Sequence, residues 1–591
     1  MTGGKTTFRA LCATFLMTLW AATANATPQA TETATTTATP PRTSNADFEL
    51  GQNVELAVGM MRGIFMYYVD PVDADALGKG AAAGMVGALD PYTELIHADE
   101  AAEFELATTG KYGGIGSIIR QRGDEVLIAE PYKDSPADRA GLQIGDAFVE
   151  IAGRSAAGMT TADVSAALKG EAGTEVTIKV RKHLTGDEQT LSIRREVIAL
   201  PPIPYYGMAA DSVGYIHHAE FTDGCADELR AAFADLKSRG ARSLILDYRG
   251  NGGGIMQEAV KILALFVPKG TEVLSMRGRS DEANKRYVTL TEPLDTEIPI
   301  AVLVDGYSAS AAEIVAGALQ DLDRGVVVGQ RTFGKGLVQS TLPLGFDSYL
   351  KITTAKYYIP SGRCVQAVDY SAQAGAGAGA GAQVAEDETG HGDRHLAVPD
   401  SLIKEFRTAG GRRVYDGGGV MPDVRLDAEY STTYAYVAYA GGHIDEFADG
   451  WMLENRGREV VPGKFALTDA DYAGFVRFME DKDLDHEPLT AGSLEALRRS
   501  AEAEKLIDDR VRGLLDSLSQ QLDRNSAASS DLYRAELTGL VEDAVVLRHH
   551  YRRGLSEHNL VSDKAVAAAV ESLRDQTEYR HILAEKDTDK K

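Results

Sequence analysis

The sequence predicts a multidomain α+β protein: an α/β core with a smaller inserted domain, flanked by helical N- and C-terminal regions. Three observations point to this. The chain has 591 residues, which at roughly 150 residues per domain suggests about four domains. Strand-like and helix-like segments alternate from residue 212 to residue 358, as in a largely parallel sheet covered by helices. Apolar residues recur at helical spacing before and after these two domains.

The composition is ordinary for a globular chain, with 44 % hydrophobic and 25 % charged residues. Acidic residues number 87 and basic ones 61, which gives a formal net charge of −26. This balance argues against a nucleic-acid partner bound through the overall field of the protein. The three cysteines are too few for a disulfide framework.

The first 26 residues predict an export signal. Lys5 and Arg9 precede the apolar run 11–22, which is too short to span a membrane easily. Ala24-Asn25-Ala26 then supplies a small-x-small cleavage pattern. We expect export to the periplasm and cleavage after Ala26. The alternative is a retained segment that associates the protein with the membrane.

Residues 27–46 are rich in Thr, Ala and Pro and predict a disordered linker. The region 47–106 is expected to be helical, since apolar residues recur there near a period of 3.6, at Val54, Val58, Met61, Ile64 and Phe65. Cleavage of the signal would leave Cys225 and Cys364. These two either pair in an oxidising compartment or remain free thiols.

Residues 107–198 predict a small domain of short strands, such as 126–128 and 176–180, with one helix near 161–168. Residues 199–426 predict the α/β core. Its expected strands are 213–221, 243–248, 300–304 and 325–328, and its expected helices are 227–236, 255–266 and 311–319. An insertion at 371–397 contains a strict Ala-Gly alternation and is expected to be flexible.

The region 427–591 is predicted to be helical. It carries two apolar stripes at helical spacing, Ile507, Val511, Leu514 and Leu518 in one and Val541, Val545 and Val546 in the other. Such stripes usually form core. The alternative is a surface for a homo-oligomer or for a substrate adaptor.

Two glycine clusters resemble nucleotide-binding loops but fail in detail. A dinucleotide fingerprint starting at Gly250 would need a small residue where Ile255 stands. The run from Gly329 to Lys335 has the spacing of a P-loop, yet Gly336 follows where a Ser or Thr should bind magnesium. Strand-like alternation rather than a helix comes next. Nucleotide binding is therefore not expected.

A better candidate for chemistry is the run Ser308-Ala309-Ser310-Ala311-Ala312-Glu313, which follows a strand and opens a helix. A serine there lies near exposed backbone N–H groups and the positive end of the helix dipole, which suits a nucleophile and an oxyanion. The alternative is an ordinary N-cap serine.

Lys335 is the candidate base for such a nucleophile. Its neighbours Gly334 and Gly336 let backbone pack closely around it, and a desolvated lysine loses its proton more easily. Gln339 follows four residues later and could orient the amine. The alternative is an exposed loop lysine. No histidine stands in a suggestive setting; a Ser-His-Asp triad would need partners that are distant in sequence.

These segments resemble those of the C-terminal processing peptidases, also called tail-specific proteases. Residues 302–314 resemble the nucleophile segment of that family, and residues 332–336 resemble its lysine segment. The resemblance implies a core of the ClpP/crotonase type, with Ser310 as nucleophile, Lys335 as general base and Gln339 as the residue that orients the lysine. It implies no metal and no cofactor.

The same resemblance covers roughly residues 47–423 and assigns the oxyanion hole. The glycine turn 246–254 would donate an N–H from Gly253 or Gly254, together with the N–H of Ala311. Gly250 and Gly252 depart from the residues common in the family, which leaves the choice between the two donors open.

Within this resemblance, residues 107–198 are similar to the PDZ domain of the family. The segment expected to bind a peptide C-terminus is Gly113, Gly114, Ile115, Gly116, Ser117 and Ile118. Successive backbone N–H groups in a glycine loop suit a carboxylate, and the strand that follows could pair with the peptide.

We therefore expect an exported serine endopeptidase that captures protein substrates by their free C-termini and cleaves near that end with a Ser-Lys dyad. The alternative from another class is a periplasmic PDZ scaffold that binds C-termini without cutting them. A lipase or esterase is not expected, because the chain lacks the G-x-S-x-G elbow.

Overall fold

The computed structural model describes residues 44–98, 100–368, 370, 403–480, 482, 484, 489–525 and 531–584. The predicted export signal and the Ala-Gly insertion lie outside the described residues. The chain divides into two compact units, one up to Ala81 and the other from Ala82 onward, and each is described by itself.

The first unit contains helix α2 (Ser44–Tyr67) and the beginning of helix α3 (Ala74–Val86). Helix α2 carries the apolar residues whose spacing predicts a helix. It begins at Ser44, so the last three residues of the predicted linker 27–46 are helical. Ser, Asn and Asp favour helix starts, which accounts for the earlier beginning at Ser44-Asn45.

The second unit starts with strand β1 (Glu94–Ile96) and helix α4 (Ala101–Thr109). The sequence predicts a mostly helical region here and no strand, so β1 is a correction. It forms because Glu94, Leu95 and Ile96 pair antiparallel with residues 349–351 of a later strand, a long-range contact that local spacing does not reveal.

A small antiparallel sheet follows, in the order β3-β4-β5-β7-β8. Its strands are β3 (Ser117–Arg122), β4 (Glu125–Pro131), β5 (Ala147–Ile151), β6 (Arg154–Ser155), β7 (Glu175–Arg181) and β8 (Glu188–Arg194). Helices α5 (Pro136–Arg139) and α6 (Thr161–Leu168) complete this part, and β2 (Lys111–Gly114) pairs with β9 (Glu196–Ala199). On β7, Val176, Ile178 and Val180 are buried and alternate with less buried residues, as expected for a sheet with one wet face.

The central sheet has the order β10-β11-β12-β15-β16-β21 and is parallel except for its first pair. Its strands are β10 (Tyr205–Ala210), β11 (Val213–His217), β12 (Ser243–Asp247), β15 (Ile300–Val304), β16 (Val326–Gly329) and β21 (Val424–Arg425). The sequence predicts a strand over 213–221, and the corresponding strand β11 is shorter. It ends at His217 because the N–H of Ala219 donates to the carbonyl of Pro202 instead of to a neighbouring strand.

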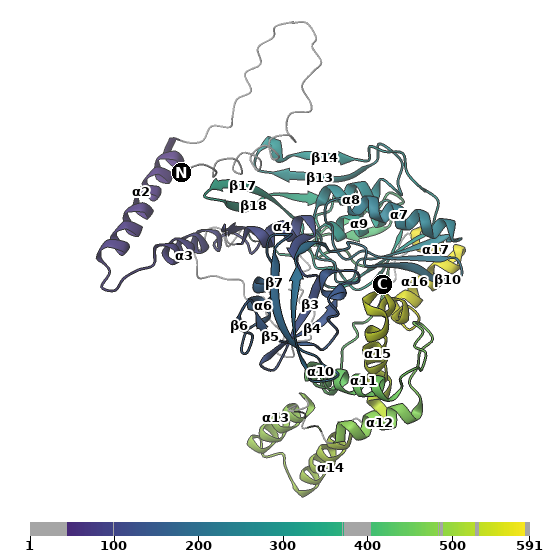
Figure 1. Cartoon of the computed structure of the whole chain (residues 1–591). Helices are drawn as coiled ribbons and strands as arrows, with labels where there is room; N and C mark the ends of the chain where they lie inside the picture. Colours follow the sequence, from purple (N-terminus) through teal and green to yellow (C-terminus); the bar gives the residue numbers. More distant parts are fainter. Residues whose placement is uncertain are drawn as a thin grey trace. The chain divides into compact units, whose positions relative to one another are not determined.

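Helices cover both faces of the central sheet. One hydrophobic cluster joins it to α7 (Cys225–Ser238), α8 (Met256–Leu263) and α9 (Ala311–Asp321), which lie close together in Figure 1. A second cluster joins Tyr215, Ile245, Leu303 and Val328 to two helices near the end of the chain, α16 (Lys564–Arg574) and α17 (Gln576–Ala584). The C-terminal region therefore completes the α/β layers.

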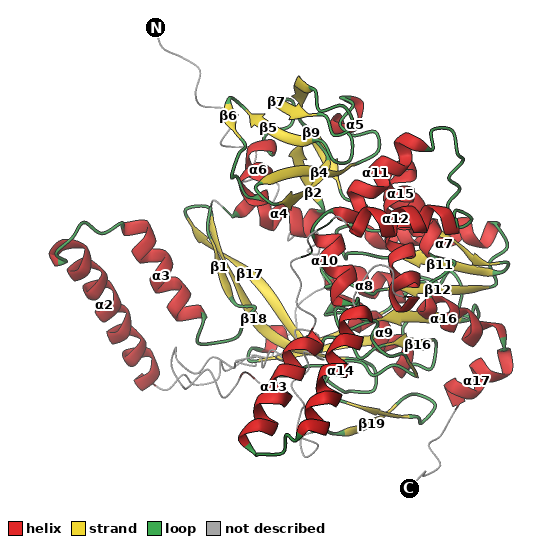
Figure 2. Cartoon of the chain, turned by 90° about the horizontal axis from the view of Figure 1, so that it is seen from below, coloured by secondary structure: helices red, strands yellow, loops and turns green. Residues whose placement is uncertain are grey.

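A third sheet contains β17 (Leu337–Gly345), β18 (Ser348–Tyr358), β13 (Glu272–Gly278) and β14 (Lys285–Val288), and also takes in β1. Figure 2 shows β1, β17 and β18 side by side. A short 3₁₀ helix, η1 (Asp281–Ala283), precedes β14, and after the insertion β19 (Glu405–Arg407) pairs with β20 (Arg413–Tyr415). The expected ClpP/crotonase likeness stays a prediction; the mixed α/β multidomain architecture is what the structure shows.

The C-terminal region contains α10 (Thr433–Ala440), α11 (His443–Glu454), α12 (Asp469–Glu480), α13 (Leu489–Ala503), α14 (Asp509–Asn525) and α15 (Asp531–Asn559). Val541, Val545 and Val546 are buried, as expected. Leu514 and Leu518 are exposed, against expectation, because α14 packs chiefly on α13. No helix in the described residues is long and apolar enough to cross a membrane.

Candidate active site

Ser310 stands at the start of α9, just beyond the carboxyl end of the central strand β15. Its backbone has φ 55° and ψ −112°, an uncommon conformation for a residue with a side chain. Strained backbone of this kind costs free energy and is found mainly where function requires it. The conformation and the helix start place Ser310 near the positive end of the α9 dipole.

Glu313, one turn into α9, binds both loops that carry the candidate catalytic residues. One carboxylate oxygen accepts the N–H of Ser310 at 2.9 Å and that of Lys335 at 2.8 Å. The other accepts the N–H of Gly334 at 2.8 Å and the hydroxyl of Thr332 at 2.6 Å. Burial raises the pKa of this carboxyl, but all four donors require an acceptor and so favour the ionised form.

Lys335 lies in a tightly packed loop. A Cβ on Gly334 would come within 2.6 Å of the Cβ of Ala367, and one on Gly336 within 2.7 Å of the amide of Gln366. The Lys335 ammonium lies 4.4 Å from the centre of the Tyr92 ring. No hydrogen bond joins it to Ser310 within the described residues.

The surroundings of Lys335 make its amine easier to deprotonate than that of an ordinary lysine. Burial lowers the pKa of the amine below its ordinary value, and the positive charge of Lys351 lowers it further. Glu313, Asp90 and Glu94 act in the opposite direction and do not cancel the effect. The structure thus gives the lysine the desolvation that its flanking glycines suggest.

Gln339 takes a different partner from the expected one. It lies on β17 directly opposite Thr353 of β18, and its amide donates to the Thr353 hydroxyl at 3.1 Å. Thr353 in turn donates to Asp90 at 3.2 Å. The expected bond from Gln339 to Lys335 is not present among the described residues, and the bond that Gln339 forms is the one from its NH₂ group to Thr353.

The glycine turn after β12 lies against the nucleophile segment. Gly253 has φ 96°, and a Cβ there would lie 2.7 Å from the Cβ of Ser310 and 2.9 Å from the amide of Ala311. The N–H of Gly253 donates to the side chain of Asn251 at 2.8 Å. A Cβ on Gly254 would meet the carbonyl of Phe221 at 2.4 Å. The structure therefore places Gly253 close to Ser310 and Ala311, with the Gly253 N–H bound to Asn251, and the oxyanion roles of these residues stay a prediction.

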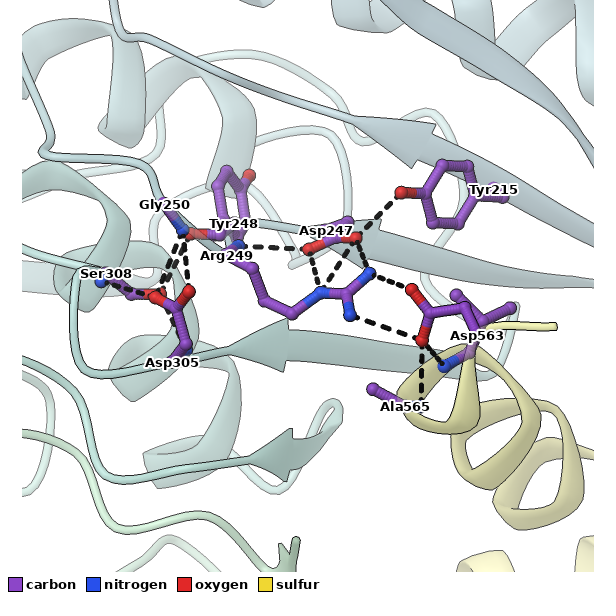
Figure 3. A network of polar contacts seen from close by, with 10 residues as sticks. Tyr215, Asp247, Tyr248, Arg249, Gly250, Asp305, Ser308, Asp563 and Ala565 are labelled. Carbon is purple, nitrogen blue, oxygen red and sulfur yellow. Dashed lines mark hydrogen bonds and ion pairs between the residues drawn. The ribbon is translucent and has the colours of Figure 1, made fainter. Parts of the chain in front are cut away.

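Asp305 links this turn to the nucleophile segment by hydrogen bonds. Both of its oxygens accept the N–H of Gly250 at 3.0 Å, and one accepts the N–H of Ser308 at 3.0 Å. The Ser308 hydroxyl donates to the carbonyl of Tyr248 at 2.8 Å (Figure 3). Tyr357 adds a further link, since its hydroxyl donates to the carbonyls of Lys335 at 2.8 Å and Ser310 at 3.2 Å.

The expected peptide-binding segment is partly strand. Gly113 and Gly114 belong to β2 and pair with β9. The turn between β2 and β3 therefore consists of Ile115 and Gly116. The carbonyl of Ile115 accepts a hydrogen bond from the backbone N–H of Ala137, and that of Gly116 accepts one from the N–H of Tyr132. The chain then enters β3 at Ser117 and Ile118. Because β3 is an edge strand of its sheet, one of its sides has no strand partner among the described residues.

Other titratable groups and cavities are further candidates for parts of a site. Burial lowers the pKa of His218 to about 4, so this histidine is neutral inside the core. Cys225 and Cys364 are both free thiols. The described residues contain no cluster suited to a metal ion. A cavity of about 1080 Å³ borders the nucleophile loop at Asp305 but includes neither Ser310 nor Lys335 in its lining.

Sequence reasoning missed the roles of Glu313, Asp305, Tyr357 and Tyr92. A usable indication existed for Glu313, because a Glu three residues after a Ser has the capping-box spacing. None existed for Tyr357, whose contact with the site depends on the pairing of distant strands.

Comparison with known proteins gives three family matches: Peptidase family S41 at residues 212–371, PDZ domain at 127–182, and Probable PDZ-protease, C-terminal helical domain at 436–573. A carboxy-terminal-processing protease of Bartonella bacilliformis is 34 % identical over 51 % of this chain and 70 % of its own length. The carboxy-terminal processing protease CtpB of Bacillus subtilis is 32 % identical over 55 % and 68 %. A solved photosystem II D1 C-terminal processing protease covers 62 % of this chain and 86 % of its own at 26 % identity, with a TM-score of 0.33.

Proposed function

The chain belongs to the carboxy-terminal processing proteases, a family of serine-type peptidases, and on that basis we propose that it cuts protein tails with Ser310 as nucleophile and Lys335 as general base. The observation that supports this assignment is the Glu313 carboxylate, which binds the backbone of both residues at once. Family membership makes the chain an enzyme, so the non-catalytic scaffold is set aside.

In the proposed reaction, neutral Lys335 takes the proton of the Ser310 hydroxyl as its oxygen attacks the scissile carbonyl. The N–H groups of Ala311 and of Gly253 or Gly254 stabilise the oxyanion. The lysine then returns the proton to the leaving amine. Water, deprotonated by the same lysine, hydrolyses the acyl-enzyme and restores the serine.

The test compares Ser310→Ala and Lys335→Ala with the unchanged enzyme on an unfolded polypeptide tail. Each variant should lose all measurable cleavage while its circular dichroism stays native. Full activity in either variant would refute the dyad. Gln339→Ala should have a milder effect, and an unchanged rate would remove the proposed orienting role.

For the PDZ domain we propose capture of the substrate's free C-terminus at the turn Ile115-Gly116, with the peptide adding to the open edge of β3 at Ser117 and Ile118. A substrate with a free terminus should bind and react better than the same substrate amidated. Equal binding and equal rates would contradict carboxylate capture. A homo-oligomer or an adaptor bound through the C-terminal helices stays a prediction.

Export to the periplasm is proposed from the N-terminal sequence alone. If the signal is cleaved after Ala26, the mature chain begins at Thr27. Mass spectrometry of the protein recovered from an exporting host tests this. An intact N-terminus together with membrane fractionation would favour the retained segment.

A further inference from the structure

The Arg249 guanidinium lies between two carboxylates that come from distant parts of the chain (Figure 3). On one side is Asp247, at the end of the central strand β12, with contacts of 3.0, 3.1 and 2.5 Å. On the other side is Asp563, with contacts of 3.2 and 2.8 Å. Asp563 belongs to the C-terminal helical region, 314 residues further along the chain. A carboxylate that meets two guanidinium nitrogens gives orientation as well as affinity.

Arg249 stands at the start of the glycine turn. Its own N–H donates to Asp247 at 3.0 Å, and the next N–H, that of Gly250, is held by Asp305. The turn continues from there to Gly253, which lies so close to Ser310 that a Cβ on it would come within 2.7 Å of the Ser310 Cβ. An arginine fixed at this point therefore fixes the entry to the proposed oxyanion hole.

The Asp247 carboxylate is buried, with 3 % of its side chain exposed. Burial alone would raise its pKa, but the Arg249 guanidinium holds the pKa below its ordinary value, and the Tyr215 hydroxyl also donates to it. Asp247 is thus a rigid anchor for one side of Arg249. The other side depends on Asp563.

Asp563 is itself held rigidly because it is the N-cap of α16. One of its oxygens accepts the N–H groups of Ala565 at 2.8 Å and Val566 at 3.0 Å. Helix α16 then packs Val566 and Ala569 against the central sheet. The carboxylate is therefore presented to Arg249 by an element that cannot easily move away.

We propose that Asp563 is a positioning residue for the peptidase reaction: through Arg249 it holds the glycine turn against Ser310 and makes the C-terminal helical region part of the catalytic unit. This inference rests on the proposed function, because the turn matters for rate only where Ser310 is the nucleophile. It adds a residue outside the peptidase and PDZ segments to the site.

The two roles of Asp563 can be separated by substitution. Asp563→Ser keeps a good N-cap but is too short to pair with Arg249. Asp563→Glu keeps a carboxylate for Arg249 but is a weaker cap. If the ion pair positions the turn, the Ser variant loses about ten- to hundredfold in kcat with little change in KM or thermal stability. The Glu variant keeps most of its kcat and loses stability.

The opposite pattern overturns the inference: a Ser variant with unchanged kcat, or two variants whose activity simply follows their stability. Asp575→Ala is the matched control, since Asp575 caps α17 through the N–H groups of Thr577 and Glu578 and has no basic partner among the residues that the structure describes. It should lose stability and keep kcat.

A double-mutant test uses Arg249→Met. In that background Asp563→Ser should have little further effect on kcat, whereas independent effects that multiply would contradict a route through Arg249. Ser310→Ala separates the two levels. If it still cleaves, the proposed function fails. If it is inactive while Asp563→Ser is fully active, only the present inference fails.

Discussion

At the scale of single residues, a buried carboxylate determines how the two proposed catalytic groups are placed. Glu313 lies inside the core with none of its surface exposed, and in the described part of the chain its donors are the Ser310 loop, the Lys335 loop and Thr332. A buried charge is tolerated when every one of its lone pairs is matched by a donor. Because these hydrogen bonds come from both loops, the position of the Ser310 loop relative to the Lys335 loop depends on the Glu313 side chain.

Replacement of this carboxylate gives the first prediction. In Glu313→Gln one acceptor oxygen becomes an NH₂ group that faces N–H donors. At least one of the two loops therefore loses its hydrogen bonds to this side chain. We expect kcat to fall by about tenfold or more, because a hydrogen bond to a charged group contributes roughly 1.5–3 kcal/mol. Steady-state kinetics on a peptide substrate measures this.

Glu258→Gln is the control. Glu258 is equally buried and accepts the N–H of Ala226 at 2.9 Å, but it binds no residue of the two catalytic loops. It should lower thermal stability and leave kcat near that of the unchanged enzyme. Equal losses of kcat in both variants would show that Glu313 acts only through stability.

The pH dependence of the reaction gives the second prediction. Only neutral Lys335 can accept a proton, so kcat/KM rises with pH through the pKa of this lysine. Burial lowers that pKa, Lys351 lowers it further, and Glu94 raises it. Lys351→Gln should therefore move the midpoint of the profile to higher pH, and Glu94→Gln to lower pH, each by up to about one unit.

The control for this shift is Lys356→Gln, which removes an equal charge from the same strand β18. Its midpoint should stay close to that of the unchanged enzyme. Midpoints that move in the same direction for Lys351→Gln and Glu94→Gln would contradict the assignment of the profile to Lys335.

Much of the site could be predicted from local sequence, and the rest depends on distant pairing. A helix start and two flanking glycines are local features that make Ser310 and Lys335 candidates, and the family resemblance then assigns their roles. The partner of Gln339 could not be found, since Thr353 faces it only after β17 and β18 pair. Asp563 could not be found either, because nothing near it in sequence indicates Arg249.

At the scale of elements, helix α15 joins the C-terminal region to the PDZ-like domain through a break in its own backbone. Tyr551 has φ 55° inside the helix, and its hydroxyl donates to Asp138 at 3.2 Å. The N–H and Nε of Arg552 both donate to Glu130 at 2.9 Å. Because the break frees an N–H that helical bonding would otherwise use, Glu130 can accept two bonds from one residue.

This contact gives the third prediction. Glu130→Ala leaves the Arg552 N–H without its acceptor at a partly buried position and should loosen the PDZ-like domain from α15. Hydrogen exchange should become faster in β4 and around Tyr551. Glu125→Ala on the same strand is the control, since Glu125 forms a surface pair with Arg181 that is worth about 0–1 kcal/mol. Identical exchange patterns in the two variants would contradict a specific link.

Element boundaries show where sequence alone is insufficient. The strand 300–304 was predicted with the same limits that β15 has, because it is buried on both faces and continuously apolar. Strand β1 and the exposed face of α14 could not be predicted, because the first depends on pairing with β18 and the second on α14 packing chiefly on α13.

At the scale of the whole molecule, the C-terminal region has two parts with different relations to the peptidase core. Helices α16 and α17 cover one face of the central sheet with Val566, Val570, Leu573 and Tyr579. Helices α13 and α14 pack on each other and are joined by the ion pair Arg498–Asp516. The first pair is thus structural core, and the second is a separate hairpin.

This difference gives the fourth prediction, which compares two deletions. A chain that ends at residue 560 lacks α16 and α17 and exposes the sheet face they cover. Each large apolar side chain lost is worth roughly 1.5–3 kcal/mol, so the sum approaches the whole stability of a domain, about 5–15 kcal/mol. We expect this chain to be unfolded or aggregated and inactive.

The second deletion replaces residues 489–525 by a short Gly-Ser linker. It should leave the melting temperature and the cleavage of a short peptide nearly unchanged, because the buried hydrophobic clusters of the C-terminal helices and of the central sheet are formed by other helices. Calorimetry and peptide kinetics on the two proteins decide between the roles. A hairpin deletion that melts as early as the shorter chain would mean that α13 and α14 also stabilise the peptidase core.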